Sequence, residues 1–183
     1  MGTDRHVVVV GVQATGLYPG HHVCVEVAWW DLTTDERGHF VPHHTVSAAL
    51  AGADIKSLRL NRYVDRIAGQ PQDCDGVEAR RLSDVLHEQT VAGSNPAFDA
   101  AFLLKMFVDV ERRDQGAIPN WHHRLWDLSA YAAGALGLDH LPGLAEVCER
   151  LDIHARPDHT AEADVTAAGL CFRALFARAG LVS

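Results

Sequence analysis

Three short segments carry polar side chains at positions where a strand or a helix is expected to begin or end. They are GVQATGL (11–17), AGSNPAFDAAFL (92–103) and HTAEAD (159–164). Side chains at such boundaries are free to converge on one cleft. Asp99 and Asp164 are of the type that holds a divalent metal ion, and His159 is of the type that acts as a general base beside it.

Each of these residues also has a plainer interpretation. Asp99 follows Phe98 early in a helix, where a carboxylate stabilises the positive end of the helix dipole. His159 and Asp164 are five positions apart and would not share one stripe of a helix, so His159 is expected in the loop before the helix begins. A surface histidine and a solvated carboxylate fit HxAxxD equally well, and both interpretations stay open on these residues alone.

The first segment lacks the acids that a metal site at this strand end would need. The run VVVV (7–10) predicts a buried strand, and the ATGLYPG that follows predicts a tight turn. Two carboxylates at the strand end would create a metal site, yet the positions are Gly11 and Gln13. Glycine offers no ligand, and glutamine offers a neutral oxygen without the charge that holds Mg²⁺ against its hydration shell.

The elements that would position these residues follow from the apolar periodicity. Strands are expected at 6–12, 22–32, 39–46 and 90–94, with a further brief strand at the start of 124–137. Helices are expected at 55–69, 77–89, 95–113, in the rest of 124–137, at 141–153 and at 160–179. Pro142 is expected in the first turn of the helix at 141–153. This order predicts an α/β fold with a mixed central β-sheet, its first three strands antiparallel, and helices packed on it.

Composition limits the class of protein. A chain of 183 residues with 48% hydrophobic content is expected to form one domain over 1–183. The formal net charge of -8 argues against a broad basic surface that grips nucleic acid, although a local phosphate site stays possible.

The cysteines and the apolar runs indicate the cellular compartment in which the protein is expected. Cys24, Cys74, Cys148 and Cys171 are far apart and form no CxxC pair, so neither a zinc site nor a disulfide framework is indicated. The start of the chain does not resemble a signal peptide, and no apolar run reaches membrane-spanning length. We therefore expect a cytoplasmic protein that does not bind membranes.

The order and spacing of the three segments resemble the DEDDh 3'-5' exonucleases, the DnaQ-like branch of the ribonuclease H-like superfamily. In that family the segments read DxETTGL, HNxxFDxxFL and HxAxxD. The matching residues here are Thr15, Gly16, Leu17, Asn95, Phe98, Asp99, Phe102, His159, Ala161 and Asp164. The resemblance covers nearly the whole chain and implies the ribonuclease H-like fold.

The resemblance also implies roles for these residues. In the family, four acids hold two divalent metals, Mg²⁺ or Mn²⁺, that activate water and stabilise the phosphate in flight. By position, Asp99 and Asp164 are the third and fourth acids and His159 is the general base, while Gly11 and Gln13 replace the first and second. Loss of two carboxylate ligands implies a weakened metal site with little or no hydrolysis, or no bound metal at all.

The substrate end of the site is implied in the same way. In the family the TGL turn meets the 3' end of the strand, so Thr15, Gly16 and Leu17 are expected to contact substrate together with Asn95 and Phe98. Phe98, Phe102 and Trp29 are candidates for base stacking, but their spacing places at least two of the three in the core. The paired histidines are interpreted as surface residues. The segments Trp29-Trp30 and Trp121–Trp126 are interpreted as a possible contact surface for a partner.

Three functional hypotheses follow. The first is an exonuclease homologue with a degenerate metal site that binds single-stranded nucleic acid, its 3' ends, or a partner protein. The second is an active metal-dependent exonuclease on DNA or RNA that uses Asp99, Asp164 and His159, with Glu26 turned toward the missing ligands. The third is a structural or interaction module. Strand alternation favours a structural hydrogen-bonding role for Glu26.

Overall fold

The computed structural model describes residues 5–114 and 120–181, and the side chains of 110–114 are not described. A five-stranded sheet has the order β3-β2-β1-β4-β5. Its strands are β1 (Val7–Ala14), β2 (Cys24–Asp31), β3 (Arg37–Phe40), β4 (Thr90–Gly93) and β5 (Trp126–Asp127). β1, β2 and β3 pair antiparallel, whereas β4 and β5 continue the sheet in parallel. The expected mixed α/β sheet with an antiparallel start is confirmed.

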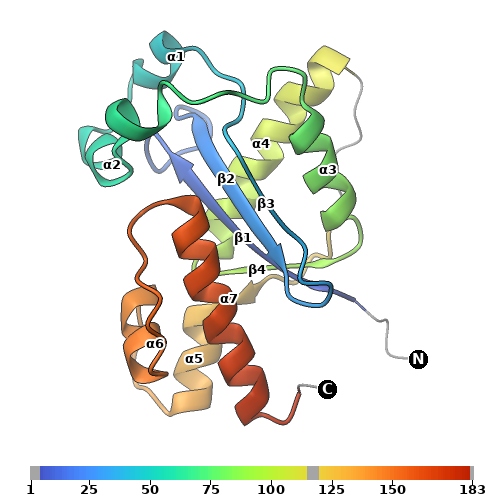
Figure 1. The fold of residues 1–183 in the computed structure, drawn as a ribbon, viewed down its shortest axis with the longest axis vertical. Coiled ribbons are helices and arrows are strands. Elements are labelled where there is room, and N and C mark those ends of the chain that lie inside the picture. Colours follow the sequence, from blue (N-terminus) through green and yellow to red (C-terminus); the bar gives the residue numbers. More distant parts are fainter. Residues whose placement is uncertain (1–4, 115–119, 182–183) are drawn as a thin grey trace.

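Helices cover both faces of this sheet (Figure 1). They are α1 (Val46–Leu50), α2 (Ile55–Leu60), the π-helical turn η1 (Tyr63–Ile67), α3 (Val77–Leu86), α4 (Pro96–Asp114), α5 (Leu128–Leu136), α6 (Leu144–Arg150) and α7 (Ala161–Arg178). α3 and α4 pack on one face, and α5, α6 and α7 pack on the other. A strand buried on both faces reads as a continuous apolar run, which explains the four valines of β1.

The alternation of side chains along β1 decides which residues face the candidate site. Val8, Val10 and Val12 join the core beneath α3 and α4, and Val9 joins the core beneath α7. Because successive residues of a strand point to opposite faces, Gly11 and Gln13 face α7. This is the helix that carries Asp164.

The expected helix at 55–69 is interrupted in the structure. α2 ends at Leu60, Arg62 adopts a left-handed conformation with φ of 53°, and η1 begins at Tyr63. The amide of Asn61 donates to the Ala14 carbonyl at 3.0 Å, which fixes the end of α2 on the end of β1. The prediction of one continuous helix was wrong because this tertiary hydrogen bond and the left-handed residue break it.

Smaller differences lie at element boundaries. The third strand covers Arg37–Phe40 rather than 39–46, and Val46 instead begins α1, which Thr45 caps by accepting from the Ala48 amide at 3.1 Å. The helix expected at 77–89 ends at Leu86. Pro142 lies before the first turn of α6 rather than within it, since Gly143 is the N-cap.

Two expectations about surface residues were wrong. Trp29 and Trp30 are each 1% exposed, so they form no partner surface. Their rings pack in the two cores beside β2, and Arg37 and Arg173 lie over the Trp30 ring, at 3.6 and 4.4 Å from its centre. His44 is buried rather than exposed.

All four cysteines are free, as the sequence pattern predicts. No helix in the described part of the chain combines the length and the apolar character needed to cross a membrane.

Candidate nucleic-acid-binding cleft

A cleft of about 420 Å³ opens where the end of β1 meets the first turn of α4 and the start of α7. Six of the residues singled out in the sequence line it. They are Gly11, Asn95, Phe98, Asp99, His159 and Asp164. The structure therefore brings together residues of the three segments that are up to 153 positions apart in the chain.

Asp99 lies in the first turn of α4 and is buried. Its Oδ1 atom accepts a hydrogen bond from the Val12 amide at 2.8 Å, which fastens the helix to β1. Burial raises the pKa of Asp99 to about 7, and the nearby Asp164 adds to this rise, although the amides of Val12 and Asp99 oppose it. The carboxyl is therefore half protonated near neutral pH.

Asp164 lies in the first turn of α7 and faces the same cleft. Its Oδ2 atom accepts a hydrogen bond from the Gln13 side-chain amide at 3.0 Å. Its Oδ1 atom is buried and has no hydrogen-bond partner in the described part of the chain. Burial raises the pKa of Asp164 to about 6, against the opposing influence of His159. Both carboxyl groups of the cleft thus resist ionisation.

His159 precedes α7 in a loop, as expected from its spacing to Asp164. It adopts a left-handed conformation with φ of 61° and is exposed at the cleft. The next residue, Thr160, caps α7 by accepting from the Ala163 amide at 3.2 Å. His159 is therefore held at the mouth of the cleft by the start of the helix, while its ring stays accessible to solvent.

The space beside Gly11 is already filled. A Cβ atom at this position would lie 2.8 Å from Val165 Cγ2 and 3.3 Å from the Ala161 carbonyl oxygen. Contacts below about 3 Å are not tolerated without movement. The glycine is thus matched to the valine one residue after Asp164. A side chain larger than glycine at this position would therefore require Val165 to move.

Glu26 is fully engaged in structural hydrogen bonds. Its carboxylate accepts from the Arg66 guanidinium, at 2.8 Å for the Nη2 to Oε2 bond, from the His39 ring at 2.9 Å, and from the Ala161 amide at 3.0 Å. Burial alone would raise the pKa of Glu26, but these hydrogen bonds outweigh it and lower the pKa to about 2. Glu26 therefore fastens the start of α7 to β2. Turning its side chain toward Gly11 would break these hydrogen bonds.

The TGL turn divides into a buried and an exposed part. Thr15 is buried, its amide donates to the Val23 carbonyl at 2.9 Å, and its Oγ1 accepts from the Val23 amide at 3.0 Å. A Cβ at Gly16 would lie 2.2 Å from the His22 ring, so only glycine fits there. Leu17 is 64% exposed. Thr15 and Gly16 shape the turn, and Leu17 is the side chain free to contact a ligand.

Asn95 and Phe98 lie at the start of α4. Asn95 is exposed, and its carbonyl accepts from the Phe98 amide at 3.0 Å. Phe98 is half-buried, with its ring centre 4.8 Å from that of Phe102, which is itself buried in the core. Because Phe102 and Trp29 belong to the core, the expectation that at least two of the three aromatic residues are core residues is confirmed.

Sequence reasoning missed three residues that shape the site. Val165 fills the space beside Gly11, and Arg66 and His39 hold Glu26. The apolar periodicity of α7 indicates that Val165 is buried, but not that it meets Gly11. No local signal pairs Arg66 with Glu26, which is 40 residues away.

The residues present do not fit a two-metal centre. The described part of the chain holds no group of three or more histidine, cysteine, aspartate or glutamate side chains arranged to bind a metal ion. Among the described residues, the cleft holds only the two carboxyls of Asp99 and Asp164, and one oxygen of each already accepts a hydrogen bond, from Val12 and Gln13.

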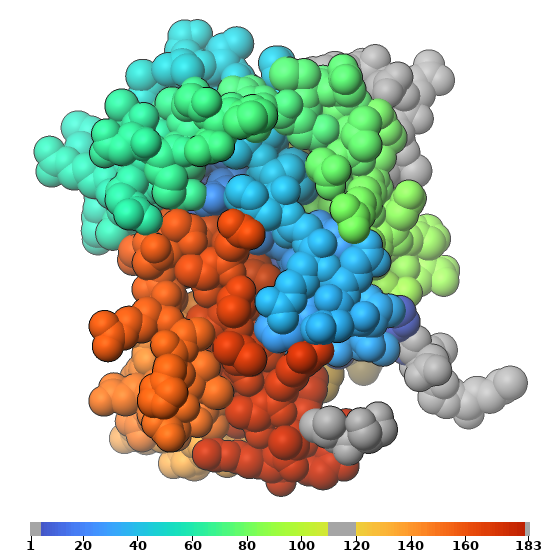
Figure 2. Space-filling model, viewed as in Figure 1, coloured from blue at the N-terminus to red at the C-terminus, as the bar shows by residue number. Residues whose placement is uncertain are grey.

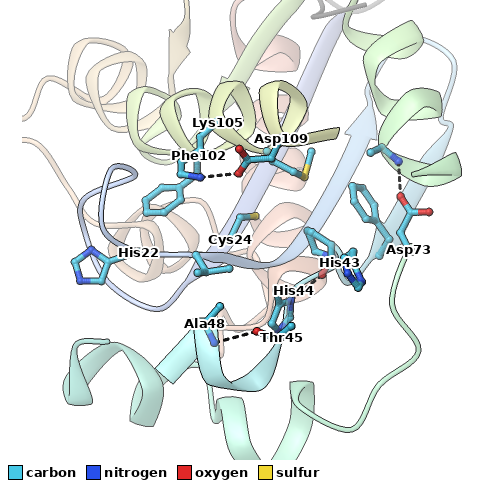
Figure 3. Close-up of a pocket in the computed structure, with 15 residues that line it drawn as sticks. His22, Cys24, His43, His44, Thr45, Ala48, Asp73, Phe102, Lys105 and Asp109 are labelled. Carbon is cyan, nitrogen blue, oxygen red and sulfur yellow. Dashed lines mark hydrogen bonds and ion pairs between the residues drawn. The ribbon is translucent and has the colours of Figure 1, made fainter. Parts of the chain in front are cut away.

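A second cavity, of about 330 Å³, lies between β2, α4 and the segment that leads into α1 (Figure 3). Its floor is apolar and includes Cys24 and Phe102. Two of its rim residues, Lys105 and Asp109, form an ion pair at 2.6 Å. Asp73, also on the rim, accepts from the Ala79 amide at 2.9 Å. Both acids therefore already interact with groups of the protein.

The sheet order and the flanking helices match the ribonuclease H-like fold that is also found in solved exonuclease structures. Solved structures of Escherichia coli exonuclease I are similar to this chain. The zinc-bound complex with single-stranded DNA has a TM-score of 0.68 at 16% identity, over 96% of this chain and 41% of that one. The complex with a dA16 oligonucleotide has a TM-score of 0.70 at 15% identity, again over 96% and 41%.

A third similar structure is the ExoI/SSB-Ct complex, with a TM-score of 0.64 at 14% identity over 96% of this chain and 42% of that one. The chain therefore spans about two fifths of the length of these exonucleases. No family model matches the sequence. No curated protein matches it either.

Proposed function

We propose that this protein binds the 3' end of single-stranded nucleic acid in the cleft without hydrolysing it and without a metal ion. The observation that carries the proposal is the hydrogen bond from Gln13 to Asp164. In the family that the sequence resembles, both positions are acidic and repel each other unless a cation lies between them. Here an amide and a carboxyl attract each other directly, so the pair is stable without metal.

The cleft stays open although the acids are lost. Its lining is mostly apolar, with Phe98 beside the exposed polar residues Asn95 and His159. A half-buried aromatic ring is a stacking surface for a base, and Leu17 stands exposed on the neighbouring turn. With two carboxylates fewer and the remaining two partly protonated, repulsion of a phosphate is reduced. These features support binding of a strand end.

The similar exonucleases support the choice of ligand. One of their structures holds zinc and single-stranded DNA, others hold oligonucleotides such as dA16, and a further one is a complex with SSB-Ct. We propose that this chain likewise binds single-stranded nucleic acid, in the cytoplasm. Binding of a protein partner is a second proposed role of the same fold. Divalent metal is not part of the proposal, because the residues of the cleft do not fit it.

The test is digestion of 3'-labelled single-stranded DNA and RNA with Mg²⁺ or Mn²⁺. We expect no shortening at high protein concentration, and no difference between the wild-type protein and the variants His159→Ala and Asp164→Ala. Shortening by the wild type that disappears in both variants would overturn the proposal and support an active exonuclease. Shortening that persists in both variants identifies a contaminating nuclease, which repurification removes before the assay is repeated.

A further inference from the structure

α2 is a short helix without any buried residue. It is nevertheless fixed at both ends to the strand end beside the cleft. The Asp54 amide donates to the Thr15 carbonyl at 2.8 Å, and the Asn61 side chain donates to the Ala14 carbonyl at 3.0 Å. Only Leu58 of this helix packs, partly buried, against the small core of Val25, Tyr63 and their neighbours, so most of the surface of α2 faces solvent or a ligand.

The exposed surface of α2 combines apolar and basic side chains. Ile55 and Leu60 are 64% and 43% exposed, and Lys56 and Arg59 are exposed between them. Neither basic side chain makes an ion pair or a hydrogen bond within the described residues. The Asp54 carboxylate is occupied by capping the helix, accepting from the Lys56 amide at 3.1 Å and from Ser57 Oγ at 2.9 Å. Lys56 and Arg59 therefore stay available to an anionic partner.

This surface is connected on two sides to segments that lead to the cleft, although none of its own side chains lines the cleft. On one side, the turn beneath α2 carries Leu17 and Tyr18, which are both about two thirds exposed, and the Tyr18 ring stacks with His22 at 6.0 Å. On the other side, Arg62 pairs with Asp158 at 3.3 Å, directly before His159. Figures 1 and 2 show α2 standing out beside the segment that leads into α7.

We infer that α2 and the 17–18 turn form a track for the part of a single strand that lies outside the cleft. This inference rests on the proposed function, which it extends from the strand end to the following nucleotides. Lys56 and Arg59 contact phosphates, and Leu17, Tyr18 and Ile55 pack against bases. The ligand class follows from the local surface, because two exposed cations beside exposed aromatic and aliphatic side chains suit a polyanion with planar bases. They form a local basic site on a protein whose net charge is -8.

The test compares a trinucleotide with a decanucleotide, which is long enough to extend from the cleft over α2. Fluorescence anisotropy with the labelled decanucleotide, and competition by the unlabelled trinucleotide, are measured at several salt concentrations. The variant Lys56→Gln/Arg59→Gln is matched by Arg81→Gln/Lys105→Gln, which also removes two exposed positive charges but lies on α3 and α4. Circular dichroism confirms that both variants are folded. DNA and RNA decamers are run in parallel to identify the preferred strand.

We expect the Lys56/Arg59 variant to bind the decanucleotide about tenfold more weakly, with a salt slope lower by about 1.4, since each phosphate contact to a single strand contributes about 0.7. Trinucleotide binding and the matched control should equal the wild type. Equal loss in the control variant, or no change in decanucleotide binding, would overturn the inference. If the wild type bound neither oligonucleotide, the proposed function itself would fail, and a protein partner for α2 would take the place of the strand.

Discussion

Replacing Glu26 with glutamine is expected to destabilise the protein by about 3 kcal/mol at pH 7. The native pKa of Glu26 is about 2, compared with an ordinary value of 4.5, and each pKa unit corresponds to about 1.4 kcal/mol. Because Glu26 is buried, little solvent screening reduces this value. The variant keeps the shape of the side chain but leaves Arg66 without its counter-charge, and breaking such a buried pair costs about 3 to 5 kcal/mol.

The same pair predicts the pH dependence. A carboxylate with a lowered native pKa contributes stability that is complete above the unfolded value of 4.5 and is lost as the pH falls toward 2. The difference between wild type and variant should therefore be constant from pH 6 to 4.5 and shrink below pH 4.5. His39 adds an opposite trend, because its hydrogen bond to Glu26 raises its pKa, so its contribution is complete below pH 6.5 and is lost at higher pH.

The assay is urea unfolding followed by tryptophan fluorescence between pH 3 and pH 8. Glu36→Gln is the matched control, because Glu36 pairs with Arg81 at 2.8 Å on the exposed surface and should cost no more than about 1 kcal/mol. A variant within about 0.5 kcal/mol of wild type at pH 7, close to the usual effect of a surface substitution, would refute this reasoning. So would a difference between the two proteins that stayed unchanged down to pH 3.

Three further predictions concern the cleft. Gly11→Ala should lower the free energy of unfolding by about 1 to 3 kcal/mol, because the added methyl group overpacks against Val165. In urea unfolding, the double variant Gly11→Ala/Val165→Ala should lose less stability than the sum of the two single variants. Additive losses would contradict the contact. Asp99→Asn should be more stable than wild type at pH 8. Because the native pKa of Asp99 is about 7, the wild-type protein loses stability as the pH rises from 3.8 through 7, and the variant does not. A difference between the urea midpoints of the two proteins that is the same at pH 8 and at pH 4 would contradict this. Phe102→Ala should lower the free energy of unfolding by about 3 to 5 kcal/mol, because Phe102 is a core residue. Phe98→Ala should weaken the free energy of oligonucleotide binding more than the free energy of unfolding. A larger effect of Phe98→Ala on unfolding than on binding would count against a stacking role.

Much of the fold could be predicted because it is encoded locally. The valine run of β1 and the apolar periodicities of α4 and α7 matched the observed elements closely. That Asp99 and Asp164 line one cleft was expected because both lie in segments at element boundaries and because the resemblance pairs them. These signals depend on neighbouring residues and were therefore visible in one sequence.

The features that decide the chemistry of the cleft depend on contacts between distant parts of the chain. Gln13 meets Asp164 across 151 positions, and Glu26 meets the Ala161 amide across 135. No periodicity reports such contacts. The interruption after α2 was missed for the same reason, since it depends on the bond from Asn61 to Ala14. The sequence predicted which acids were absent, but only the structure shows that Val165 fills the space.

The central claim is that the cleft binds a strand end without metal. Its most direct test is the anisotropy of a labelled single-stranded oligonucleotide with a free 3' end, titrated in EDTA and in Mg²⁺, beside a circular strand of the same sequence. We predict the same affinity in EDTA and in Mg²⁺, and weaker binding of the circular strand. Binding that appears only with metal, accompanied by shortening of the strand, would contradict the account and identify a working exonuclease.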